Sequence, residues 1–334
     1  MKKSVMSLLL SVLFAFSATM GLGETVIMWN EVNGEEYGAT VGAHAFEKKL
    51  LELSDGKMML DLYINAELGS EAESMQGIQM GTLDIFRGNA SSLSSYGADL
   101  IAATGLPFLF ESMEEFQEFA QSDLGQAVLD SVEAADCGFV ALGWMVEGPR
   151  SIFITEQTWK TLGEPEQVTL DSMKGLVIRS GNALIEQTLQ ALGAETVPVV
   201  FSELKKSLQA GNIDGAENGI TPYLDNEFYQ PAPFFIPDAH IFGCGVILMS
   251  KATWEALSEE EKGWVREAAQ AAGDACYEYN VEYEQACMDQ FDALGIHTLP
   301  VADLEKWQEA CQPLYDQQGE TVQELIRQVQ HREY

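Results

Sequence analysis

The chain has 334 residues, 46% of them hydrophobic, which is enough for two domains with a full core. Its 52 acidic residues against 18 lysines and arginines give a formal net charge of −34. This balance argues against nucleic acid and anionic membranes as partners, because both are bound through Lys and Arg. It does not imply a cationic ligand, since the local field in a cleft can oppose the net charge.

The first 23 residues have the pattern of a secretory signal peptide. Lys2 and Lys3 precede an apolar stretch too short for a comfortable membrane span, and small residues follow at Gly21 and Gly23. We therefore expect export to the periplasm and a mature chain that begins near Glu24. No cysteine follows the apolar stretch, which argues against a lipoprotein anchor.

Strands and helices are predicted to alternate through the first part of the chain. Hydrophobic periodicity and turn residues predict, in order, strand 26–29, helix 35–53, strand 58–64, helix 71–80, strand 83–86, helix 114–134 and strand 139–146. This alternation is typical of a mostly parallel sheet with helices on both faces.

The segment from Lys174 to Gly219 is the most informative. It reads as a strand that ends at Arg179, a helix, a second strand, a second helix, and an acidic turn that contains Asn218. Polar residues at strand ends face ligand crevices in α/β folds. Arg179 and Asn218 are therefore placed where a small anion could be held.

The remainder of the chain is mainly helical after an apolar strand at 240–249. Ser258 and Glu261 form a capping-box pattern, and the helix they begin is expected to reach about Leu294 with an interruption near Gly273. A short strand at 297–301 and two helices follow. Because no linker separates the halves, we expect two lobes that the chain crosses more than once: lobe I from 24–147 with 244–283, and lobe II from 148–243 with 284–334.

No motif for catalysis or nucleotide binding is present. None of the four histidines has metal-ligand spacing, and the five cysteines contain no CxxC pair. We expect no enzymatic activity, no cofactor and no metal. One disulfide remains open, although Cys276 and Cys287 would lie about 16 Å apart on a continuous helix, too far to bond.

Arginines are scarce, and Arg179, Arg150 and Arg87 each follow a predicted strand. A guanidinium matches a carboxylate with two parallel hydrogen bonds. Each of these arginines is therefore either an anchor for an anionic ligand or a partner for one of the many acidic side chains.

Six motifs occur in a fixed order: Gly56–Ile64, Ala66–Glu71, Gln79–Ile85, Gly105–Phe110, Lys174–Arg179 and Leu192–Asn218. Through them nearly the whole mature chain resembles the extracytoplasmic solute receptors of TRAP transporters, the DctP-type family. The resemblance implies a two-lobed α/β fold like that of periplasmic binding proteins, with a ligand cleft between the lobes and long C-terminal helices.

The same resemblance implies a function. Such a receptor, expected to be a monomer, captures a small organic carboxylate and delivers it to TRAP membrane permease subunits driven by an ion gradient. The ligand would be a sugar acid, a keto or hydroxy acid, or an amino-acid-like acid. The alternatives are a secreted enzyme on the same scaffold and a receptor that serves a sensor kinase.

The resemblance also implies a set of ligand-binding residues. Arg179 matches the family arginine that pairs with the ligand carboxylate. Two positions depart from the family pattern: Gly181, two residues after Arg179, and Gly219, after Asn218, each stand where the family commonly has proline. These departures leave the ligand open. The other expected contacts are Asn218, Arg150, Asn89, Asn30, Glu31, Trp29 and Glu71.

Overall fold

The computed structural model describes residues 25–334, so the predicted signal peptide lies outside the described residues. The first half of the chain forms β1 (Thr25–Asn30), α1 (Gly38–Leu53), β2 (Met58–Tyr63), α2 (Glu71–Met80), β3 (Ile85–Asn89), α3 (Asp99–Ala102), α4 (Met113–Ala120), α5 (Asp123–Ala134), β4 (Phe139–Ile154) and α6 (Glu156–Thr161). A short 3-10 helix, η1 (Ala90–Tyr96), follows β3.

The second half forms β5 (Val177–Ser180), α7 (Ala183–Ala191), β6 (Glu195–Pro198), α8 (Leu204–Gln209), β7 (Gly215–Gly219), α9 (Ile220–Asp225), β8 (Phe234–Ser250), α10 (Lys251–Ala256), α11 (Glu259–Met288), α12 (Phe291–Leu294), β9 (His297–Thr298), α13 (Leu304–Asp316) and α14 (Glu320–Gln330). Among residues 25–334, no helix is both long and apolar enough to cross a membrane.

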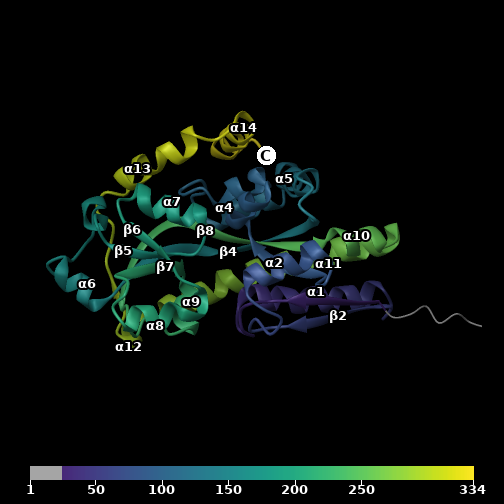
Figure 1. The fold of residues 1–334 in the computed structure, drawn as a ribbon, viewed down its shortest axis with the longest axis horizontal. Coiled ribbons are helices and arrows are strands. Elements are labelled where there is room, and N and C mark those ends of the chain that lie inside the picture. The colour runs from purple at the N-terminus through teal and green to yellow at the C-terminus, as the bar shows by residue number, and fades with distance from the viewer. Residues whose placement is uncertain (1–24) are drawn as a thin grey trace, which may run out of the picture.

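One sheet runs through the molecule, with the strand order β2-β1-β3-β8-β4-β7-β5-β6 and β9 beside β8 (Figure 1). The long strands β4 and β8 pair antiparallel over most of their length. They join two groups of short strands, β1 to β3 on one side and β5 to β7 on the other. The sheet is therefore mixed rather than mostly parallel, because the two central strands oppose each other and their neighbours β7 and β3.

Strand β4 is twice as long as the sequence predicted, since it continues through Gly148 and Pro149 instead of ending at Val146. A register shift between Val146 and Pro149 accommodates the proline, which cannot donate a ladder hydrogen bond. Arg150 consequently lies inside a strand and not in a loop after it. The same central ladder extends β8 to 17 residues.

Helix α11 runs unbroken through Gly273, where an interruption was expected. A Cβ at that position would lie 2.5 Å from the Trp144 carbonyl oxygen, so the glycine permits close packing of α11 on β4. The predicted capping box of Ser258 and Glu261 is confirmed. The predicted helix 114–134 is two helices, because Ser122 begins a new one as the N-cap of α5.

Hydrophobic clusters lie on both sides of the sheet. One packs β1 and α1 against α11, another packs β4 against α8 and α9, and the largest extends beneath α4, α5, α7 and α13. Helices α13 and α14 cover the latter side, opposite α8 and α9 (Figure 1). All five cysteines are buried and free.

Candidate ligand-binding site

Arg179 is a buried cation whose terminal nitrogens are available. It lies on β5, only 7% exposed, and its Nε donates to the Val199 carbonyl oxygen at 2.9 Å. Nη1 and Nη2 have no hydrogen-bond or ion-pair partner within residues 25–334. A Cβ on Gly181 would come within 2.9 Å of Nη1, so this glycine leaves room for the guanidinium. Burial lowers the pKa of Arg179, as expected for a charge that lacks a counter-ion.

Asn218 lies on the neighbouring strand β7 and is also buried. Its Oδ1 accepts a hydrogen bond from the Gly219 amide at 2.9 Å, which orients the side chain. Its Nδ2 has no partner among the described residues and remains a free donor. Pairing of Asn218 with Ser151, next to Arg150, brings the predicted residues of β7 and β4 together.

Arg150 is held in a buried chain of charges. Its Nε and Nη2 donate to the two carboxylate oxygens of Glu217 at 2.7 and 2.8 Å. On the other side of Glu217, His240 Nε2 lies 3.7 Å from Oε2, and His240 Nδ1 lies 2.7 Å from Asp238 Oδ2. Glu217, Asp238 and His240 are fully or almost fully buried.

The protonation states of this chain follow from its geometry. Burial opposes ionisation of Glu217, but Arg150 and His240 outweigh it and hold its pKa well below the ordinary value. Burial alone would lower the pKa of His240, whereas Asp238 and Glu217 raise it to about 9. At neutral pH Glu217 is therefore ionised and His240 is protonated.

The opposite half of the sheet contributes Glu71 and Asn89. Asn89 Nδ2 donates to Glu71 Oε2 at 3.1 Å, and Arg87 Nη1 donates to Asn89 Oδ1 at 3.2 Å. Glu71 is the first residue of α2, where a carboxylate is favoured by the helix dipole. Asn182, three residues after Arg179, donates to Ser91 Oγ, two residues after Asn89, at 3.1 Å, so the ends of β5 and β3 that carry Arg179 and Asn89 lie next to each other.

Arg87, for which sequence analysis left open a ligand anchor or an internal ion pair, is the centre of an internal cluster. Its Nη2 lies 3.2 Å from Glu31 Oε1 and its Nη1 lies 3.3 Å from Glu147 Oε1. The guanidinium also lies over the ring of Tyr37, which donates a hydrogen bond to Glu147. Glu31 is fully buried in this cluster, so its carboxylate already has a cationic partner.

Trp29 and Asn30 make contacts within the protein. Trp29 is fully buried and packs edge-on against Phe46. Asn30 is equally buried and makes hydrogen bonds with Gly69 O, Ser74 Oγ and Leu68 N. The structure therefore gives no support to ligand contacts from Trp29, Asn30 or Glu31, since each side chain is engaged elsewhere.

Sequence analysis missed Glu217, Asp238 and His240. A signal was present, because each is a charged or titratable residue inside an otherwise apolar or small-residue strand. Among residues 25–334, no group of three or more His, Cys, Asp and Glu side chains could hold a metal ion. Arg179 provides charged N–H donors for a carboxylate, and Asn218 provides a neutral N–H donor.

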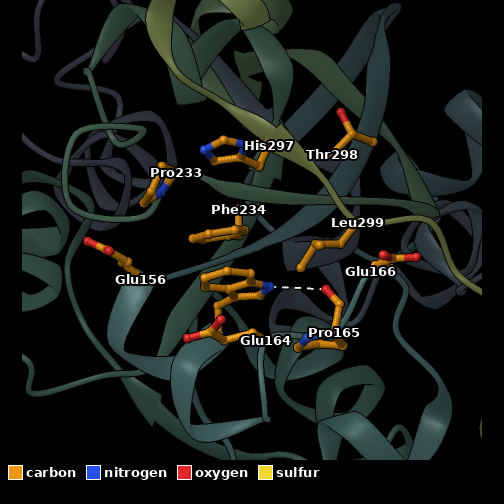
Figure 2. Close-up of a pocket in the computed structure, with 10 residues that line it drawn as sticks. Glu156, Glu164, Pro165, Glu166, Pro233, Phe234, His297, Thr298 and Leu299 are labelled. Atoms are coloured by element: carbon orange, nitrogen blue, oxygen red, sulfur yellow. Dashed lines mark hydrogen bonds between the residues drawn. The ribbon is translucent and has the colours of Figure 1, made fainter.

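A separate cavity of about 570 Å³ lies between α6 and β9 (Figure 2). Trp159, Phe234 and His297 form a stack of rings there, and the Trp159 indole donates to the Pro165 carbonyl oxygen. Glu156, Glu164 and Glu166 also line it. These carboxylates make it unsuitable for an anion, so the arrangement around Arg179 is the better candidate.

The central strands β4 and β8 are shared by both halves of the sheet, and a buried arginine with free donors lies on β5, two strands from β4. This is the arrangement of a solute-binding protein of the two-lobed periplasmic type. The model of the bacterial extracellular solute-binding proteins, family 7 (DctP), matches residues 30–321, and the chain belongs to this family.

Relatives agree with this assignment. The sialic acid-binding periplasmic protein SiaP of Vibrio cholerae is 29% identical over 290 residues, which cover 86% of this chain and 85% of the relative. The C4-dicarboxylate-binding periplasmic protein DctP of Rhodobacter capsulatus is 21% identical over 302 residues, which cover 89% of this chain and 87% of the relative.

Solved structures of TRAP periplasmic solute-binding proteins are similar as well. One from a Bradyrhizobium species, in complex with galacturonate, has a TM-score of 0.84 and 27% identity and covers 91% of this chain and 99% of its own. One from Pseudomonas putida, with bound D-glucuronate, has a TM-score of 0.84 and 25% identity, with 91% and 96% covered. The expectations of a TRAP-type periplasmic receptor, of its two-lobed α/β fold and of a non-enzymatic role are confirmed.

Proposed function

We propose that this protein captures a small hydroxylated organic acid, of the sugar-acid or hydroxy-acid class, with Arg179 as the carboxylate anchor. The observation that carries the proposal is the buried Arg179 guanidinium, whose Nη1 and Nη2 have no partner within residues 25–334. A buried unpaired charge is costly, and a ligand carboxylate supplies the missing counter-ion.

The surroundings support a ligand rich in hydroxyl groups. Asn218 Nδ2 adds a free donor beside Arg179, and Arg150 keeps Nη1 outside its pair with Glu217. Glu71, held by Asn89, adds carboxylate oxygens that accept from hydroxyls. The galacturonate and D-glucuronate bound by relatives each carry one carboxylate and several hydroxyls. Such a ligand would match the donors of Arg179 and Asn218 and the acceptors of Glu71.

We further infer delivery to TRAP membrane permease subunits by a monomeric receptor whose lobes close on the ligand. Support comes from the family and from the central strands β4 and β8, which both halves share. The lobe limits remain a prediction: 24–147 with 244–283 for lobe I, and 148–243 with 284–334 for lobe II. Separate hydrophobic clusters around α1 and around α8 and α9 favour this division.

Titration calorimetry with D-glucuronate, D-galacturonate, D-erythronate and D-gluconate tests the proposal. The unmodified protein should bind at least one of them, and Arg179→Ala should weaken that binding by about 3–5 kcal/mol, several hundredfold or more. Arg179→Lys should retain part of the affinity, because it keeps the charge without the two-pronged geometry. Arg327→Ala, on an exposed helix, is the matched control. Unchanged affinity in Arg179→Ala would refute the anchor.

A further inference from the structure

Most of the charged groups around Arg179 are paired with one another. Four cationic side chains meet five carboxylates in and beside this region, namely Arg179, Arg150, Arg87 and His240 with Glu71, Glu217, Asp238, Glu31 and Glu147. Almost all of these groups are buried, so water screens them poorly. Their balance therefore bears directly on the ligand charge that the site accepts.

Two of the arginines are already neutralised. Arg150 donates twice to Glu217, and Arg87 lies between Glu31 and Glu147. His240 is flanked by Asp238 and Glu217. Of these four cations, only Arg179 has no counter-ion within residues 25–334, so it can compensate one ligand carboxylate and no more.

Glu71 lies at the β3 side of the same region: it accepts from Asn89, and Ser91, two residues further on, accepts from Asn182, three residues after Arg179. Its one hydrogen-bond partner among the described side chains is the neutral amide of Asn89, and no cation pairs with it in residues 25–334. Arg87 donates a hydrogen bond to Asn89 Oδ1. A rotation of the Asn89 amide away from Glu71 would break this hydrogen bond. A hydroxyl that reaches Glu71 can donate to it, whereas a second carboxylate would meet a like charge.

We propose that Glu71 selects monoanionic hydroxy acids and rejects their dicarboxylate counterparts. This inference rests on the proposed function and deepens it, because relatives of this chain include both a sialic acid-binding and a C4-dicarboxylate-binding protein. The selection is electrostatic: the first carboxylate pairs with Arg179, and the far end of the ligand must present hydrogen-bond donors to Glu71.

Matched acid pairs test this selection. D-Gluconate and D-glucarate differ at one end, where a hydroxymethyl group replaces a carboxylate, and D-erythronate and meso-tartrate differ in the same way. Calorimetry at pH 7.5 should show the monoacid of at least one pair bound at least about tenfold more tightly than its diacid. Glu71→Gln, of nearly the same shape, should reduce that ratio to about threefold or less by strengthening diacid binding.

Glu67→Gln removes the same charge from an exposed position in the preceding loop and should leave the ratio unchanged. Melting curves of both variants establish that they are folded. Equal binding of monoacid and diacid by the unmodified protein would overturn the inference while leaving the proposed function intact. A preference that survives in Glu71→Gln would overturn the role of Glu71. Failure to bind any acid would refute the proposed function and the inference together.

Discussion

Arg150 and Glu217 form a two-pronged ion pair across adjacent antiparallel strands, with N–O distances of 2.7 and 2.8 Å and a fully buried carboxylate. The pair orients Arg150, whereas the nearby Arg179 has no counter-ion within residues 25–334. Stability and ligand recognition are therefore coupled at this point of the sheet.

Glu217→Gln should lower the free energy of unfolding by about 3–5 kcal/mol, because it leaves Arg150 buried without its counter-ion. Chemical denaturation at pH 7 measures this change. Glu324→Gln breaks an exposed pair with Arg327 and, as a control, should cost about 1 kcal/mol or less. A similar small effect for both variants would contradict the importance assigned to the buried pair.

His240 should make stability fall in alkaline solution. Its pKa is raised in the folded protein to about 9 by Asp238 and Glu217, above the ordinary value of 6.5. The folded state thus binds the proton more tightly, so the stabilisation is complete below pH 6.5 and disappears as pH rises through 9. The free energy of unfolding should fall by up to about 3 kcal/mol between pH 6 and pH 10 because of this group. His240→Gln should flatten that slope, and an unchanged slope would exclude His240 as its source.

Gly148 is needed because Glu284 of α11 occupies the space beside it. A Cβ on Gly148 would lie 1.0 Å from Glu284 Oε1, so Gly148→Ala should displace the side chain and cost about 1–3 kcal/mol. Glu284→Ala removes the obstacle. Gly148→Ala should therefore lower the free energy of unfolding less in the Glu284→Ala background than in the unmodified protein, by about 1 kcal/mol or more. Additive losses in a thermal-unfolding cycle would contradict this contact.

Asn30 and Asn218 should behave in opposite ways. Asn30→Ala removes three hydrogen bonds that hold the 68–74 segment and should destabilise the protein by about 1–3 kcal/mol with little effect on ligand affinity. Asn218→Ala loses a bond to the adjacent Gly219 amide and a free donor, so it should weaken binding more than stability. Calorimetry and thermal unfolding of the two variants separate these roles. A large loss of ligand affinity in Asn30→Ala would show that Asn30 contributes to ligand binding.

Much of the local structure was predictable from residue order. Helix α2 has the bounds that its periodicity predicted, and the capping box at Ser258 begins α11 as expected. The strand-helix pattern of 174–219 also placed Arg179 on a strand, whereas Asn218, expected in a turn, lies inside strand β7. Such features depend on residues within a few positions of one another, and periodicity and caps record them directly.

Partners and sheet direction were not predictable in the same way. Arg150 and Glu217 are 67 residues apart, and Arg87 and Glu31 are 56 apart, so nothing local distinguishes these pairs from other acids and bases. Pro149 appeared to end a strand, but the central ladder carried β4 past it. Residue order alone was sufficient for the family and most elements, and it pointed to Arg179 as the candidate anchor. Only the tertiary structure determined which of the three arginines lacks a counter-ion. The reason is that the central strands decide which carboxylates come within hydrogen-bond distance of each arginine.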